Sequence, residues 1–130
     1  MGTRHSFALL LVTVALAAGC GDAAPPGGPS AVFDAWKRAG LTVSTLTSST
    51  PLAGGECRAG NANGVEVTLC TYADDKAATG AQPAGLAVVG DATGASLAQG
   101  TMLLVVADRR KTDPTGKTIN QLTKVFRGRS

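Results

Sequence analysis

The segment from Cys57 to Cys70 constrains the fold of this chain most, because its turn residues and its two cysteines both predict the same β-hairpin. Asn63-Gly64 is the strongest short signal for a β-hairpin, since both central residues of a type I′ turn take a positive φ. If these two residues form the turn, Cys57 and Cys70 are equally far from it and face each other. Counting outward makes them a non-hydrogen-bonded pair, whose Cα atoms approach to about 4.5 Å, within disulfide range. We therefore predict a disulfide between them.

The two cysteines could in principle serve redox or metal chemistry instead. A redox dithiol usually needs a close motif such as C-x-x-C, which Cys57 and Cys70 do not form. Two cysteines without a neighbouring histidine leave a zinc tetrahedron half empty. We therefore expect a structural crosslink, with no metal and no cofactor. Alternating Val65, Val67 and Leu69 predict the core-facing side of the hairpin, which puts the disulfide on the face away from the core.

The first 19 residues have the shape of a signal peptide. Arg4 and His5 precede an uncharged, mostly apolar run over residues 7–18. That run makes about 18 Å of helix, which is too short for a hydrocarbon core of about 30 Å. No later segment reaches the roughly 20 apolar residues that a spanning helix needs. We therefore expect residues 1–19 to be removed on export.

A short motif at the end of this run carries a resemblance to a known family. Leu16-Ala17-Ala18-Gly19-Cys20 resembles the lipobox of bacterial prolipoproteins, with Ala17 where the family usually has Leu. The resemblance implies cleavage before Cys20, a diacylglyceryl group on its thiol and often a further acyl chain on the new amino terminus. Two or more acyl chains anchor a protein stably to a membrane. Lipidation would also explain the odd number of cysteines in an exported chain. The alternative is secretory cleavage after Ala17, which leaves Cys20 as a free thiol.

The chain after cleavage divides into three predicted parts. These are Cys20 with a linker over 20–30, one domain over 31–127, and a tail over 128–130. The linker is Gly, Pro and Ala with few other residues, so it cannot bury a core and should be flexible. Gly21 after the cysteine resembles the default for outer-membrane sorting in Gram-negative lipoproteins, which implies a domain that faces the periplasm.

Periodicity predicts the elements of the domain. Residues 101–108, TMLLVVAD, form the most apolar run and indicate a central strand buried on both faces. Ser30 can cap a helix that runs to Arg38, with Phe33 and Trp36 facing the core. The other expected elements are a strand over 41–47, a loop over 48–55, a helix over 76–80 capped by Asp74 or Asp75, a short strand over 86–89, a helical turn over 92–99 and a last helix from Asp113-Pro114. Together they predict an α+β fold: a small, mostly antiparallel sheet with a disulfide-bridged hairpin, packed against two or three helices.

Residue types that carry catalysis are scarce. The single histidine, His5, lies in the signal peptide, so the mature chain lacks the commonest general base and metal ligand. Asp74, Asp91 and Asp108 could form an acid pair, but such aspartates usually cap helices or lie in solvated turns. We therefore expect no catalytic residue and no enzymatic activity.

The carboxyl-terminal end is basic, with seven Lys or Arg residues and one acid from residue 109 to residue 130. Arg109, Arg110 and Lys111 are the predicted partner-binding patch, for an acidic protein, an anionic lipid or an envelope glycan. A solvated helix face and tail is the simpler interpretation. Nucleic acid is not an expected partner of an exported chain.

These features predict a membrane-anchored envelope lipoprotein with a non-catalytic binding or structural domain. The alternative is a periplasmic inhibitor or small-ligand-binding module, which predicts a solvent-exposed pocket near Trp36. The third hypothesis, a carboxylate-based enzyme, requires two buried acids that converge in one cleft.

Overall fold

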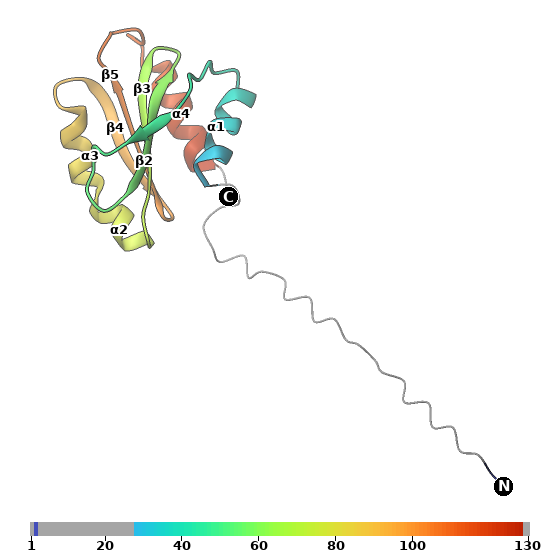
Figure 1. Cartoon of the computed structure of the whole chain (residues 1–130). Helices are drawn as coiled ribbons and strands as arrows, with labels where there is room; N and C mark the ends of the chain where they lie inside the picture. The colour runs from blue at the N-terminus through green and yellow to red at the C-terminus, as the bar shows by residue number, and fades with distance from the viewer. Residues whose placement is uncertain (1, 3–27, 129–130) are drawn as a thin grey trace.

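The computed structural model describes Gly2 and residues 28–128, and it contains a five-stranded sheet with helices on both faces (Figure 1). The strand order is β1-β2-β3-β5-β4, and each neighbouring pair is antiparallel. The predicted α+β fold is confirmed. In chain order the elements are α1 (Gly28–Arg38), β1 (Thr47–Ser49), β2 (Glu56–Ala62), β3 (Val65–Thr71), α2 (Asp75–Gly80), α3 (Gln82–Val89), β4 (Thr93–Gln99), β5 (Met102–Asp108) and α4 (Lys117–Gly128).

Strands β2 and β3 form the predicted hairpin. Asn63 and Gly64 occupy its turn with φ angles of 49° and 85°, as a type I′ turn requires. Cys57 lies opposite Cys70 in the strand register. Their Cα atoms are 4.0 Å apart and their sulfur atoms are bonded. The predicted disulfide and its register are therefore confirmed.

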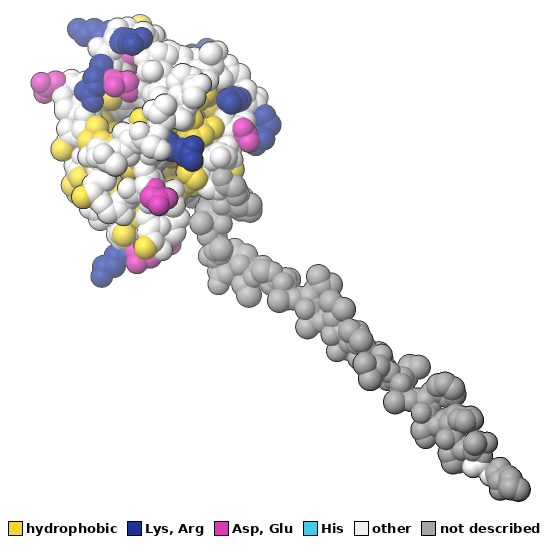
Figure 2. Space-filling model, viewed as in Figure 1, with side chains coloured by type: hydrophobic (Ala, Val, Ile, Leu, Met, Phe, Trp, Pro, Cys, Tyr) yellow, Lys and Arg dark blue, Asp and Glu magenta, His cyan; other side chains and the backbone are white. Residues whose placement is uncertain are grey.

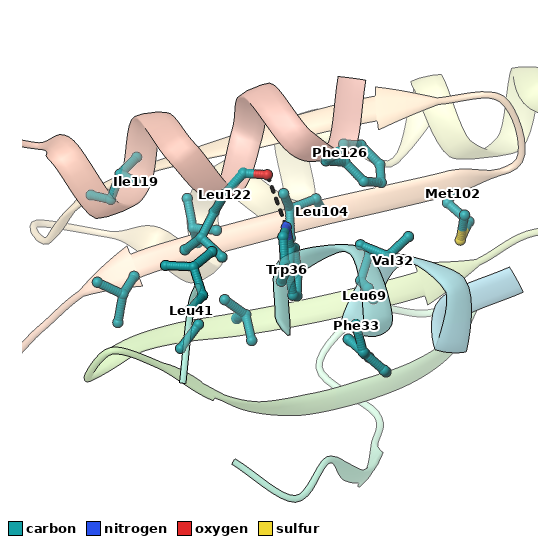
Figure 3. Close-up of a cluster of buried hydrophobic side chains, with 14 residues drawn as sticks. Val32, Phe33, Trp36, Leu41, Leu69, Met102, Leu104, Ile119, Leu122 and Phe126 are labelled. Carbon is teal, nitrogen blue, oxygen red and sulfur yellow. Dashed lines mark hydrogen bonds between the residues drawn. The ribbon is translucent and has the colours of Figure 1, made fainter. Parts of the chain in front are cut away.

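The larger core lies between one face of the sheet and helices α1 and α4 (Figure 3). Trp36 of α1 is fully buried, and its indole Nε1 donates a hydrogen bond of 3.1 Å to the carbonyl oxygen of Leu122 in α4. The ring of Phe33 packs at 5.7 Å from the ring of Trp36. Trp36 and Phe33 are therefore core residues, as the helical spacing predicts.

Strand β5 is buried along its whole length. Because side chains alternate along a strand, β5 contributes to the cores on both faces of the sheet. Met102, Leu104 and Val106 belong to the first core, and Leu103, Val105 and Ala107 belong to the second. The prediction of a central strand buried on both faces is confirmed.

The disulfide is part of the second core, so the prediction that it lies away from the core is wrong. Cys57 is 5% exposed and Cys70 is 0% exposed. Both pack in a cluster with Leu52, Tyr72 and other apolar residues, and the same cluster includes Ala78 of α2 and Val89 of α3. The chain after β3 returns over this face as two helices, which the alternation within one hairpin does not reveal.

Other local predictions are wrong between residues 80 and 100. Residues 86–89 end helix α3 instead of forming a strand, and residues 93–99 form strand β4 instead of a helical turn. A short apolar run fits a strand and a helix equally well. The small residues of β4 also hide its alternation, although Ala95 and Leu97 pack on the first core while the Ser96 hydroxyl donates to the Gln82 carbonyl oxygen of α3.

Three element boundaries also differ from prediction. Helix α1 begins at Gly28, before the predicted Ser30 cap and inside the predicted linker. The predicted strand over 41–47 is reduced to an isolated bridge between Val43 and Ala62, followed by the short strand β1. Helix α4 begins at Lys117 and not at Asp113-Pro114.

Candidate functional site

The loop from β5 to α4, residues 109–116, is built on two buried carboxylates. Asp108 is 5% exposed and Asp113 is 6% exposed. One oxygen of Asp108 accepts from the backbone N–H and the hydroxyl of Thr112, at 2.9 and 3.2 Å. Its other oxygen accepts from the backbone N–H of Asp113 at 2.9 Å. Because both oxygens have donors, Asp108 holds this loop in one shape.

Asp113 connects this loop to helix α4 through hydrogen bonds. Its two oxygens accept from the backbone N–H groups of Thr118 and Ile119, at 3.0 and 2.9 Å. These groups lie in the first turn of the helix, where backbone donors lack partners within the helix. Asp113 thus caps α4 from four residues before its start. The Asp113-Pro114 pair, which predicted the start of the helix, therefore marks the cap and not the first turn.

The protonation of Asp108 follows from these contacts. Burial opposes ionisation of this carboxyl, but hydrogen bonds from the Asp113 and Thr112 backbone and from the Thr112 hydroxyl outweigh it. The pKa of Asp108 is therefore lowered below its ordinary value. At neutral pH the group is an ionised acceptor, which suits a structural carboxylate better than a proton donor.

Arg109 is half-exposed, at 44%, but its guanidinium already has several partners inside the fold. Its Nε lies 2.9 Å from an oxygen of Glu66 on β3. Its two terminal nitrogens donate to the carbonyl oxygens of Val88 and Val89 at the end of α3. Cations near a helix carboxyl terminus are favourable, so Arg109 joins β5, β3 and α3. Sequence reasoning missed Glu66 and this internal role.

Arg110 and Lys111 are exposed, and they border two different hollows. Lys111 lines a hollow of about 760 Å³ together with Asp91 and other residues of the β4 and β5 ends. Arg110 lines a second hollow of about 460 Å³, together with Glu66. The three predicted basic residues therefore form one ridge between the two hollows, and Arg109 lines both of them. Lys111 takes its place in this ridge with a positive φ of 57°.

The surface around this ridge carries both signs of charge. Lys and Arg side chains gather at the upper end of the molecule in Figure 2, where β5 ends in Figure 1, and acidic side chains lie among them. The hollow beside Lys111 is lined by Asp91, Asp108 and Asp113, and the hollow beside Arg110 is lined by Glu66. The exposed cations can bind carboxylates or phosphates, with these acids limiting where such groups fit.

The three candidate acids do not gather at one place. Asp91 and Asp108 line the same hollow, whereas Asp74 caps α2 by accepting from the backbone N–H of Ala77 at 2.7 Å. Within residues 28–128, no three His, Cys, Asp or Glu side chains are grouped so that they could hold a metal ion.

The ligand-binding alternative required a solvent-exposed pocket near Trp36, but this side chain is fully buried and its indole N–H is bonded to Leu122. Cys20 and the predicted signal peptide over 1–19, except Gly2, lie outside the described residues. No helix in the described part of the chain has the length and the apolar character needed to cross a membrane. Comparison with protein-family models, with curated proteins and with solved structures finds no match to this chain.

Proposed function

We propose that this chain is an exported lipoprotein precursor, anchored to a membrane through Cys20, whose domain binds a partner without catalysis. The observation that carries the proposal is the bond between Cys57 and Cys70. Disulfides form and persist in oxidising compartments outside the cytosol. Because these two cysteines bond to each other and the chain has three in all, Cys20 has no cysteine of its own chain to pair with. Lipidation gives this residue a role.

Metabolic labelling with a fatty-acid analogue tests the anchor. We expect label in the wild type and none in Cys20→Ser. The matched control is the double variant Cys57→Ala, Cys70→Ala, which removes the disulfide but should keep the label. Equal label in the wild type and in Cys20→Ser would refute the anchor.

Binding without catalysis is supported by how the charged groups of the site are used. The oxygens of Asp108 and Asp113 accept hydrogen bonds from backbone and hydroxyl donors that hold the loop and the start of α4, which supports a structural role for both carboxylates. Arg110 and Lys111 are instead exposed beside two hollows. We propose them as the groups that contact a partner, with Arg109 holding the ridge in position. The envelope location, in the outer membrane facing the periplasm, is part of the same proposal.

A further inference from the structure

The domain has two opposite ends, and α1 begins at one of them. Pro29 at the start of α1 shares a hollow with Glu56 and Thr71, which are the first residue of β2 and the last residue of β3. We call this the anchor end. Gln121 in the first turns of α4 donates to the carbonyl oxygen of Ala39, just after the end of α1. Figure 3 shows that α4 runs antiparallel to α1, because Phe126 lies on the side of Val32 and Ile119 on the side of Trp36, so the last turn of α4 also lies at the anchor end. In Figure 1 the start of α1 and the end of α4 lie at the same end of the fold.

The basic ridge lies at the other end, which we call the loop end. The chain after α1 arrives there, because Thr42 and the turn residue Asn63 exchange two hydrogen bonds. The β5–α4 loop packs beside the same turn, with Thr112 about 3 Å from where a Cβ on Gly64 would be. Strands β2, β3 and β5, each seven residues long, separate the two ends. Seven residues of strand span roughly 24 Å.

The length of chain between Cys20 and Gly28 limits how the domain can stand on a membrane. Residues 20–27 reach at most about 28 Å, at roughly 3.5 Å a residue. For the loop end to rest on the headgroups, these residues would have to run back along nearly the whole domain at almost full extension. The anchor end, in contrast, reaches the surface without stretching the chain.

We infer that the loop end faces away from the anchoring membrane, where Arg110 and Lys111 bind an acidic surface of another protein. This inference rests on the proposed anchor at Cys20. Separation from the headgroups argues against anionic lipid of the same membrane as the partner. The acids Glu66 and Asp91 flank the basic ridge and would repel a glycan with closely repeated negative charges. A protein surface can place single carboxylates opposite Arg110 and Lys111 without placing others opposite Glu66 and Asp91.

Fluorescence quenching on vesicles tests the orientation. The full lipidated protein carries one added labelled cysteine, Arg110→Cys at the loop end or Thr50→Cys at the anchor end, and the vesicles carry a quencher on their headgroups. Thr50→Cys should lose most of its fluorescence and Arg110→Cys little, in both neutral and anionic vesicles. Quenching of Arg110→Cys equal to that of Thr50→Cys contradicts the inference alone. Protein that does not float with the vesicles contradicts the anchor as well.

Photo-crosslinking in cells tests the partner, with a photoreactive residue at Thr115 beside Lys111. We expect an adduct with a protein that is lost in the double variant Arg110→Glu, Lys111→Glu. The charge-matched control, Lys76→Glu with Lys124→Glu, changes two exposed lysines on α2 and α4 and should keep the adduct. Three outcomes contradict the inference: an adduct with lipid or glycan, an adduct with protein that persists in the Arg110→Glu, Lys111→Glu variant, or no adduct.

Discussion

Asp108 accepts a hydrogen bond of 2.9 Å from the backbone N–H of Asp113, whose own carboxylate caps helix α4. The two aspartates thus connect the end of the central strand to the start of the last helix. The exposed residues Arg110 and Lys111 lie between them in sequence. The buried acid pair at the end of β5 therefore supports the loop that carries these two cations.

Asp108→Asn should loosen this support. The amide keeps the size of the side chain but turns one acceptor into a donor that faces the N–H of Thr112 or Asp113. We expect faster amide exchange at Thr112 and Asp113 and a melting temperature lower by roughly 5 °C or more. The exposed acid Asp91, changed to Asn, is the matched control and should change neither. Unchanged exchange in Asp108→Asn would contradict the proposed role of this carboxylate.

The same carboxylate predicts a dependence on pH. Because hydrogen bonds lower the pKa of Asp108 in the folded state below the ordinary value of an aspartate, its contribution to stability is complete above that ordinary value. The contribution is lost as the pH falls through the folded-state pKa. The difference in stability between the wild type and Asp108→Asn should therefore shrink on acidification below about pH 4. Denaturant titrations at several pH values measure this difference in the free energy of unfolding. A difference that grows on acidification would contradict the predicted lowering of the Asp108 pKa in the folded state.

The disulfide should stabilise the fold by an amount that rises slowly with the length of the loop it closes. A sequence separation of 13 corresponds to about 3 kcal/mol in the chain-entropy model. We expect Cys57→Ala with Cys70→Ala to lower the free energy of unfolding by about that amount, as measured by urea denaturation. Reduction of the wild type should have a similar effect. A double variant as stable as the wild type would show that the bond adds nothing to this hairpin.

Two glycines provide a matched test of packing. A Cβ on Gly94 would lie 2.0 Å from the carbonyl oxygen of Val106, whereas one on Gly80 would meet nothing within 4 Å. Gly94→Ala must push β4 away from β5, and we expect a loss of about 2 kcal/mol or more. Gly80→Ala, at the end of α2, should be neutral or stabilise by up to about 1 kcal/mol. Equal melting temperatures for the two variants would contradict the close approach of these strands.

The single tryptophan reports on the first core. Trp36→Phe removes the indole N–H that binds the Leu122 carbonyl oxygen and leaves a small cavity. We expect a loss of about 2 to 3 kcal/mol in the free energy of unfolding. In the wild type, iodide should quench the tryptophan fluorescence weakly, because the ring is fully buried. Strong quenching would mean that α1 does not cover the sheet as described.

The sequence predicted those features that local signals determine. The hairpin was predictable because the turn at Asn63-Gly64 and the positions of Cys57 and Cys70 are independent signals for one register. Strand β5 was predictable because an unbroken apolar run of its length suits a strand buried on both faces.

Contacts between distant segments explain what the sequence did not predict. A Cβ on Gly85 of α3 would lie 2.3 Å from the hydroxyl of Ser96, so small residues let the helix approach β4 and leave no periodic pattern. The partners of Arg109 lie 20 or more residues away in the chain. Its position in the basic run was therefore predictable, but its occupied guanidinium was not.

The intact mass of the protein extracted from membranes tests the central claim most directly. The account predicts a chain that begins at Cys20, carries a diacylglyceryl group on that residue with or without a further acyl chain, and lacks two hydrogens because Cys57 and Cys70 are bonded. A mature chain that begins at Ala18, with Cys20 unmodified, would contradict the anchor and the orientation that depends on it.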